Sequence, residues 1–112
     1  MNKEHVLINR VDLKEGECQV IKVPDGRFEK EMFIVRYRGE YHVYENSCPH
    51  TGGPLDWMPG QFLDLEKNHI QCSTHHALFR INDGFCISGP CSGQRLKKVN
   101  LKESERQFEL EI

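Results

Sequence analysis

The chain lacks an excess of either charge and has no long apolar run. Its 112 residues contain 15 Lys and Arg against 17 Asp and Glu, and the mean hydropathy is −0.62. A nucleic-acid-binding surface would show as a clear excess of basic residues. A membrane-spanning helix needs about 20 consecutive apolar residues. We therefore expect a protein that binds neither nucleic acid nor a membrane.

The sequence also lacks the signatures of several enzyme classes. It contains no glycine-rich dinucleotide loop, and no set of residues suggests a mononuclear-iron facial triad. No apolar region of the secretory type follows the N-terminal residues. We expect a cytoplasmic protein consisting of one domain over residues 1–112, because a chain of this length leaves little room for a second core.

Cysteine and histidine, in contrast, are abundant. The chain has five Cys and six His. An odd number of cysteines cannot all pair within one molecule. Without a secretory leader, this composition favours metal binding over a disulfide framework.

The hydrophobic pattern indicates β-structure throughout. Residues 107–112 alternate strictly between polar and apolar side chains, as expected of a strand with one buried face. Turn signals at Arg38-Gly39 and Asn82-Asp83-Gly84 predict hairpins. An all-β sandwich or barrel is therefore predicted, with further strands near residues 5–9, 18–23, 32–37, 41–46, 77–81, 85–88 and 99–101.

Two short motifs combine the cysteines and histidines. Cys48-Pro49-His50 lies in a loop rich in Pro and Gly. Cys72-Ser73-Thr74-His75 lies where the next strand is expected to end, and 21 residues separate Cys72 from His50. Two thiolates and two imidazoles suit zinc or iron–sulfur chemistry. A single residue between Cys48 and His50 is tight for two ligands of one zinc ion. The spacing fits better if each loop gives its Cys to one iron and its His to another, as in a Rieske [2Fe–2S] centre.

These motifs resemble the Rieske-type ferredoxins. Residues 48–55 resemble the first cluster loop, and residues 72–75, with Asp83-Gly84 and Gly89-Pro90, resemble the second loop, its hairpin and the proline loop. The resemblance implies an antiparallel β-sandwich with a cluster-binding subdomain of two loops and a proline loop at one end, at about residues 46–92. It also implies one [2Fe–2S] cluster, with metal ligands Cys48, His50, Cys72 and His75.

The chain departs from the family pattern in three places. The 21-residue spacer is longer than usual, so we expect residues 57–68 to form an extended loop or hairpin. His76 stands where the family usually has Gly. In the cytochrome-complex branch a disulfide joins the two loops, but Gly53 and Thr74 occupy those positions here and cannot form it.

The resemblance also bears on the reduction potential. High-potential members place a Ser and a Tyr hydroxyl near the cluster, whereas Ala77 and Phe79 stand at the matching positions. Hydrogen bonds to the sulfurs raise the potential. We therefore expect a value near the low end of the Rieske range, about −150 mV.

The remaining histidines and cysteines have simpler interpretations. His5, His42 and His69 are expected to be surface or cross-strand residues, and Cys18 a small strand hydrophobe. Cys86 and Cys91 flank the proline loop and are expected to be free thiols, although a bridge between them is conceivable. Two interpretations remain open for the apolar side chains near the first loop: packing of the loop, or a docking rim for a redox partner. They belong to Leu55, Trp57, Met58, Pro59 and Phe62.

Together these features predict an electron-transfer protein rather than an enzyme. We expect a monomeric ferredoxin that accepts an electron from a flavin reductase and passes it to a terminal oxygenase or hydroxylase. One alternative is a small subunit of a larger reductase, similar to the nitrite reductase small subunit. The other is a structural zinc module, which a colourless protein without acid-labile sulfide would reveal.

Overall fold

All regular structure in the described chain is β-strand. The computed structural model describes residues 5–25, 27–49, 53–56, 58, 60–72 and 77–111. The described part of the chain has no helix that could cross a bilayer. Its nine strands are β1 (His5–Asn9), β2 (Cys18–Asp25), β3 (Phe28–Tyr37), β4 (Glu40–Glu45), β5 (His69–Gln71), β6 (Leu78–Arg80), β7 (Cys86–Ser88), β8 (Lys98–Glu103) and β9 (Gln107–Glu111).

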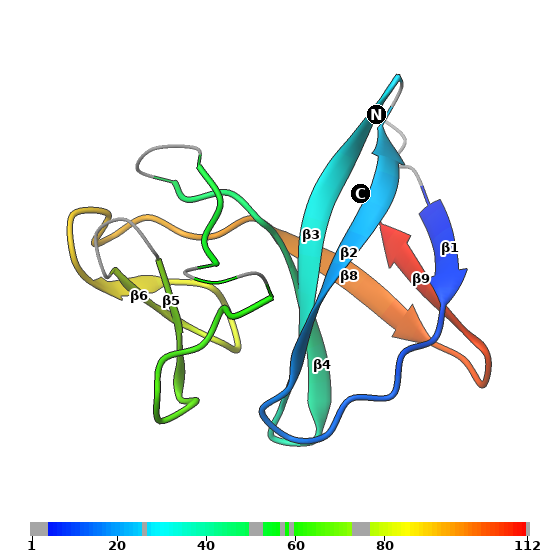
Figure 1. Ribbon diagram of the computed structural model, residues 1–112, viewed down its shortest axis with the longest axis horizontal. Helices are drawn as coiled ribbons and strands as arrows, with labels where there is room; N and C mark the ends of the chain where they lie inside the picture. The colour runs from blue at the N-terminus through cyan, green and yellow to red at the C-terminus, as the bar shows by residue number, and fades with distance from the viewer. Residues whose placement is uncertain are drawn as a thin grey trace.

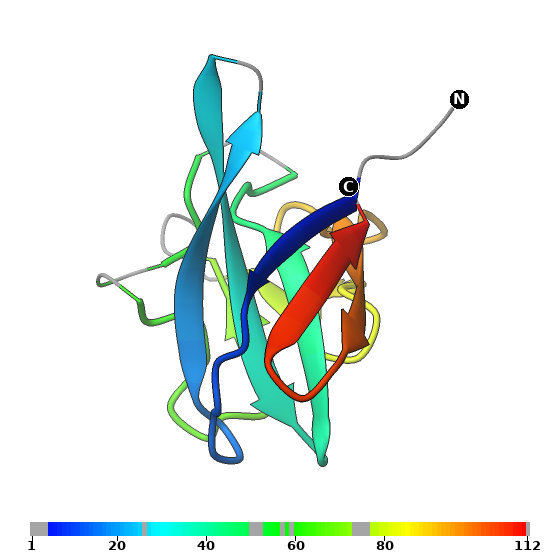
Figure 2. The ribbon, with the colours of Figure 1, turned by 90° about the vertical axis from the view of Figure 1, so that its right-hand side faces the viewer.

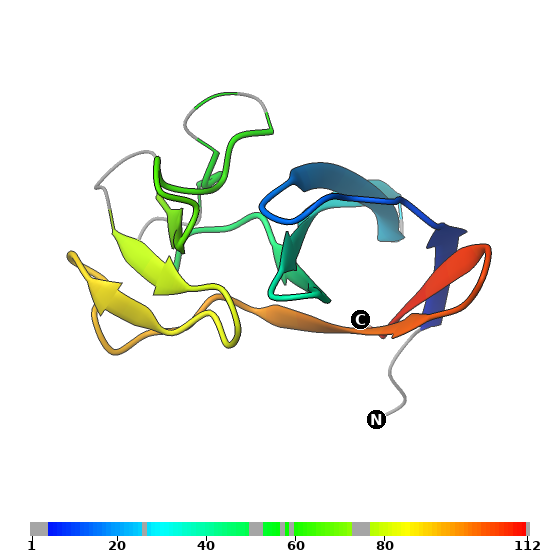
Figure 3. The ribbon, with the colours of Figure 1, turned by 90° about the horizontal axis from the view of Figure 1, so that it is seen from below.

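Six strands form one antiparallel sheet in the order β1-β9-β8-β4-β3-β2. Figure 2 shows β1 and β9 side by side, with β8 on the other side of β9. Seen from below, the sheet curls around its own interior (Figure 3). Val6 of β1 and Val23 of β2, from opposite edges of the sheet, contribute to the same core. The all-β antiparallel fold predicted from the sequence is confirmed.

The second sheet is small and lies to one side. It has three antiparallel strands in the order β5-β6-β7 and is surrounded by long loops (Figure 1).

β3 connects the hydrophobic cores of the two sheets, because successive side chains of a strand point to opposite faces. Its Phe33 and Val35 pack toward the small sheet, whereas Met32 and Ile34 pack inside the curled sheet. β3 is therefore buried on both faces and connects two hydrophobic cores.

The predicted hairpin between β3 and β4 is confirmed at its turn. Arg38 and Gly39 both have positive φ, 51° and 77°, which is the backbone of a type I′ turn. The Glu15 carboxylate accepts hydrogen bonds from both backbone N–H groups, at 2.6 and 3.1 Å. These bonds lower the pKa of Glu15. The turn is thus held by a residue from a distant part of the sequence.

Two details make the sequence expectations more specific. β5 was expected only as a strand that ends at Cys72, without bounds. It pairs with β6, and an isolated bridge joins its Ile70 to Leu63. Backbone hydrogen bonds beside this bridge join residues 62–64 to residues 69–71, so the end of the expected segment 57–68 forms a hairpin, one of the two forms expected. His42 was expected at the surface or across from another strand; it lies across from Val35 on β3, in agreement with the second form, and it is buried.

Candidate metal centre

Two of the four predicted ligands meet inside the protein. The Sγ atoms of Cys48 and Cys72 are 3.4 Å apart. Cys48 follows β4 of the large sheet, and Cys72 follows β5 of the small sheet. Both side chains are buried, with 1% and 0% exposure. The fold therefore brings together two thiols that are far apart in the sequence.

The two cysteine loops are closed in the same way. The backbone N–H of Cys48 donates to the carbonyl of Gly53 at 2.8 Å, and that of Cys72 donates to the carbonyl of Ala77 at 2.9 Å. Each loop thus folds back on its own cysteine over five residues. The loops contain the other two predicted ligands, His50 and His75, which lie outside the described residues. Thr74 and His76 also lie outside them.

Asn46 anchors the first loop where it leaves β4. Its amide Nδ2 donates to Glu31 at 2.8 Å and to Asp56 at 3.2 Å, and its Oδ1 accepts the N–H of Leu55 at 2.7 Å. These bonds join the start of the loop, its far end and β3. In the sequence, the only signal for this role of Asn46 is its place between a strand and a cysteine loop.

The proline loop packs directly against the second cysteine loop. Gly89 has φ of +101°, and a Cβ atom there would lie 2.8 Å from Cα of Ala77. This contact is closer than real Cβ atoms make. Only glycine fits at this position, so the loop lies against the segment that follows residue 76.

The apolar side chains near the first loop divide between the two interpretations. Leu55 and Phe62 are fully buried, and Phe62 stacks on Phe33 with ring centroids 4.1 Å apart. These two residues pack the loop onto the scaffold. Met58 is 55% exposed, so a docking role stays open for it. Trp57 and Pro59 lie outside the described residues.

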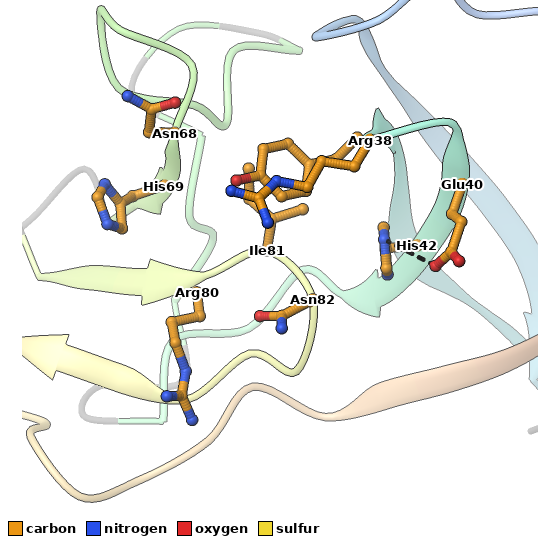
Figure 4. A pocket seen from close by; sticks show the side chains of 9 residues that line it. Arg38, Glu40, His42, Asn68, His69, Arg80, Ile81 and Asn82 are labelled. Carbon is orange, nitrogen blue, oxygen red and sulfur yellow. Dashed lines mark ion pairs between the residues drawn. The ribbon is translucent and has the colours of Figure 1, made fainter.

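A polar hollow of about 410 Å³ lies between the turn after β3 and the ends of β5 and β6 (Figure 4). Two of its side chains already have partners: Arg80 binds Asp83 at 2.6 Å, and His69 lies 3.2 Å from Asp64. Burial, followed by the charge of Lys98, lowers the pKa of His42. None of its lining residues belongs to either cysteine loop. The thiol pair is therefore a better candidate for the metal centre than this hollow.

The thiol pair suits two ligands of one metal ion. With metal–sulfur distances of about 2.3 Å, two thiolates of a tetrahedral site lie about 3.8 Å apart. The observed 3.4 Å is close to this value. Two Cys on one iron leave the two His for the other, which is the asymmetry of a Rieske centre.

Comparison with known proteins agrees with this chemistry. A sequence profile described as "Rieske [2Fe-2S] domain" matches residues 3–104. The chain belongs to the Rieske [2Fe-2S] domain family. The Rieske resemblance noted in the sequence is thereby confirmed, and the family is one that carries a [2Fe–2S] cluster.

Two curated proteins share part of this Rieske domain. Over 73 residues, or 65% of this chain, it is 30% identical to "Apoptosis-inducing factor 3" of Homo sapiens. The figures are the same for "Alkene monooxygenase system, ferredoxin component" of Xanthobacter autotrophicus. The matched segment covers only 11% of the first protein and 53% of the second.

A solved structure shares the fold over nearly the whole chain. It is the ferredoxin of carbazole 1,9a-dioxygenase from Nocardioides aromaticivorans IC177, with a TM-score of 0.69 and 20% sequence identity. The similarity covers 99% of this chain and 98% of that one. The predicted Rieske-type β-architecture is therefore confirmed at the level of the fold.

Proposed function

We propose that this protein is a one-electron carrier that holds one Rieske-type [2Fe–2S] cluster. Its ligands would be the thiolates of Cys48 and Cys72 and the imidazoles of His50 and His75. The observation that carries the proposal is the meeting of two buried cysteine sulfurs, from loops on different sheets, at 3.4 Å. Each of these loops also carries one of the histidines.

The protein's own residues would position and shield this group. A bound [2Fe–2S] cluster supplies the one-electron redox couple. The two loop-closing hydrogen bonds hold Cys48 and Cys72 in place, and Asn46 fixes the base of the first loop. The core around the two cysteines, including Phe79 and Leu55, excludes water from the sulfur side.

We further propose how the carrier is used. It would accept an electron from a flavin reductase and pass it to a terminal oxygenase or hydroxylase, as a monomer in the cytoplasm. The names of two similar proteins, a ferredoxin component of an alkene monooxygenase system and a ferredoxin of a dioxygenase, support this role. The whole chain, residues 1–112, would be one domain, with the cluster-binding part at about residues 46–92.

The ligand assignment is tested by cysteine replacement. We expect the purified protein to contain iron and acid-labile sulfide in equal amounts and to give a Rieske EPR signal after reduction. Cys48→Ser and Cys72→Ser should each abolish this signal, whereas Cys18→Ser on β2 is the matched control and should retain it. A normal Rieske signal in either ligand variant would refute the assignment.

The same preparation separates the competing functions. A colourless protein that contains zinc and no sulfide would identify a structural zinc module. A protein that becomes soluble only when a larger reductase chain is co-expressed would identify a permanent subunit. A coloured monomer in light scattering, which is reduced by a flavin reductase and reoxidised by an oxygenase, is the result we expect.

A further inference from the structure

A second pair of cysteines lies in the loop that carries Gly89 and Pro90. The Sγ atoms of Cys86 and Cys91 are 3.2 Å apart, and both residues are free thiols with 1% exposure. The Cys86 thiol also lies 3.2 Å from the carbonyl oxygen of Ser88. Cys86 begins β7, and Cys91 follows five residues later, after the proline.

The backbone holds the two sulfurs together. The N–H of Cys86 donates to the carbonyl of Gln94 at 2.8 Å, and the N–H of Gln94 donates to the carbonyl of Cys91 at 2.9 Å. Gly89, between the two cysteines, is fixed by its close contact with Ala77. A disulfide has an S–S distance of about 2.05 Å. The sulfurs therefore need to approach by only about 1.2 Å, which is within the reach of side-chain rotation.

We propose that Cys86 and Cys91 form a reversible dithiol–disulfide pair, oxidised by a low-molecular-weight disulfide such as oxidised glutathione. The thiolate of one cysteine attacks the oxidant, forming a mixed disulfide and releasing one glutathione. The other cysteine then attacks the mixed disulfide and releases the second glutathione. One protein S–S bond forms, the S–S bond of the oxidant breaks, and the two thiol protons end on the two glutathione molecules.

The surroundings of the pair determine its rate. Burial, followed by the hydrogen bond with Cys86, raises the pKa of Cys91 to about 12. The thiolate is the reactive form, so the first attack requires the loop to open and admit the oxidant. Once the mixed disulfide exists, the neighbouring thiol is already held in place. We therefore expect slow oxidation and little accumulation of the mixed disulfide.

The disulfide would restrain the proline loop, whose Gly89 packs against Ala77. Cys91 lies near enough to Cys48 for the charge of Cys48 to contribute to the raised pKa of Cys91. The pair therefore borders the proposed metal centre without belonging to its ligand set. In the oxidised form, opening of residues 86–91 is restrained by a covalent bond. The inference is independent of the proposed electron-carrier function, because none of its steps uses a metal.

Peptide mapping of the full-length protein tests the pair directly. The protein, as isolated, is equilibrated in glutathione buffers of stepped potential, quenched in acid, alkylated with a maleimide and digested with trypsin. Cleavage after Arg80 and Arg95 releases residues 81–95, which contain Cys86, Cys91 and no other cysteine. Cys48 and Cys72 lie on two other peptides, residues 39–67 and 68–80, so a bond between them gives a different product.

We expect residues 81–95 to become lighter by two hydrogen atoms and to lose both maleimide labels in oxidising buffer. Reductant should restore the doubly labelled peptide. The ratio of disulfide to dithiol should change about tenfold for each 30 mV or so of buffer potential, as for any two-electron couple. Cys86→Ser and Cys91→Ser should each leave one cysteine that is labelled or carries glutathione, and Cys18→Ser should oxidise as the wild type does.

Two results would overturn the proposal. In one, residues 81–95 remain doubly labelled in the most oxidising buffer, even after prolonged incubation. In the other, both cysteines carry glutathione and no internal disulfide forms. The mapping of wild-type protein decides between these results and ours even if the serine variants fail to fold. Iron content and EPR, measured on the same samples, report separately on the proposed cluster.

Discussion

A hydroxyl group at one of two positions should change the reduction potential of the proposed centre. Ala77 and Phe79 are both buried and carry no hydroxyl. We expect Ala77→Ser and Phe79→Tyr each to raise the midpoint potential, because a hydrogen bond to sulfur stabilises the added electron. If the reduced state gains about 1 kcal/mol more than the oxidised one, the rise is about 40 mV, since about 59 mV corresponds to a tenfold change for one electron.

Redox titration of the wild type and both variants checks this expectation. The wild type should lie near the low end of the Rieske range, at about −150 mV. Cys18→Ser adds a hydroxyl on β2 and should leave the potential unchanged. A wild-type midpoint above about +100 mV, or lower potentials in both hydroxyl variants, would contradict the role assigned to these positions.

Gly89 is a second position where a single added atom, a Cβ, should change the stability of the protein. An added Cβ would combine a left-handed backbone, at φ +101°, with a contact of 2.8 Å to Ala77. The backbone costs about 1–2 kcal/mol, and overpacking costs about 1–3 kcal/mol. We therefore expect Gly89→Ala to lower the free energy of unfolding by about 2–5 kcal/mol, measured by urea denaturation.

Gly93 provides the matched control for this substitution. It also has a left-handed backbone, at φ +88°, but a Cβ there would meet nothing within 4 Å. Gly93→Ala should therefore cost only the backbone term of about 1–2 kcal/mol. Equal losses in the two variants would show that the contact between Gly89 and Ala77 contributes nothing to stability.

At the scale of an element, the turn between β6 and β7 depends on one carboxylate. Asp83 accepts hydrogen bonds from the Arg80 guanidinium at 2.6 and 3.0 Å and from the Phe85 N–H at 3.0 Å. Burial raises the pKa of Asp83, but these bonds and the charges of Arg80 and Arg95 outweigh it, so its pKa is lowered overall. The ionised form therefore stabilises the hairpin.

This lowered pKa predicts an acid-dependent contribution to stability. It is fully present above the pKa of an unfolded Asp, about 3.9, and is lost as the pH falls through the lower folded value. We expect Asp83→Asn to be less stable at neutral pH, by on the order of 0.5 kcal/mol, because the pair is partly exposed. The difference from the wild type should shrink below pH of about 4.

Urea unfolding of both proteins at stepped pH measures this difference. Asp12→Asn, a change at an exposed carboxylate that pairs with Arg10, is the control for the loss of a surface ion pair. A difference between wild type and Asp83→Asn that stays constant down to the lowest pH would argue against a stabilising charge at Asp83.

Elements differ in how far the sequence alone predicted them. β9 was predictable because Phe108 and Leu110 alternate with polar residues and are both buried. The bounds of β5 were not, because it has three residues and one buried side chain, Ile70, whose partners come from other segments. A period-2 pattern needs more residues than this to be visible. The local sequence pattern therefore does not reveal the bounds of short strands that pair with distant segments.

The residues of the candidate metal centre also differ in how far the sequence alone predicted them. The Cys-x-His and Cys-x-x-His spacing was enough to predict the loops, and the structure brings Cys48 and Cys72 together. Asn46 gave no comparable signal. The sequence alone does not distinguish a solvated polar residue after a strand from one that is held by hydrogen bonds. Its role depends on Glu31 and Asp56, which only the folded chain places beside it.

At the scale of the whole molecule, two hydrophobic cores share β3 and β4. One lies inside the curled sheet, and the other contains Cys48, Cys72 and the small sheet. Tyr44 of β4 is buried in the second core, where its hydroxyl donates to the carbonyl of Ile81. Burial raises the pKa of Tyr44, so this hydroxyl keeps its proton. The curled sheet is stabilised by its own core. The loops around Cys48 and Cys72 would depend in part on the metal bound by these two sulfurs.

Removal of the metal centre should therefore loosen one half of the molecule and spare the other. Metal binding adds its free energy to the folding of the loops that supply the ligands, and the stability of a protein varies from region to region. We expect chelation of iron to speed amide hydrogen exchange by at least tenfold in described residues between 46 and 92, equivalent to about 1.4 kcal/mol. β1, β8 and β9 should keep their protection, because their core contains neither Cys48 nor Cys72.

This difference is measured by hydrogen exchange with mass spectrometry on the protein before and after iron removal. Cys48→Ser should reproduce the iron-free pattern. An equal loss of protection in both halves would mean that the two cores unfold as one unit and that the curled sheet is not an independent scaffold for the centre.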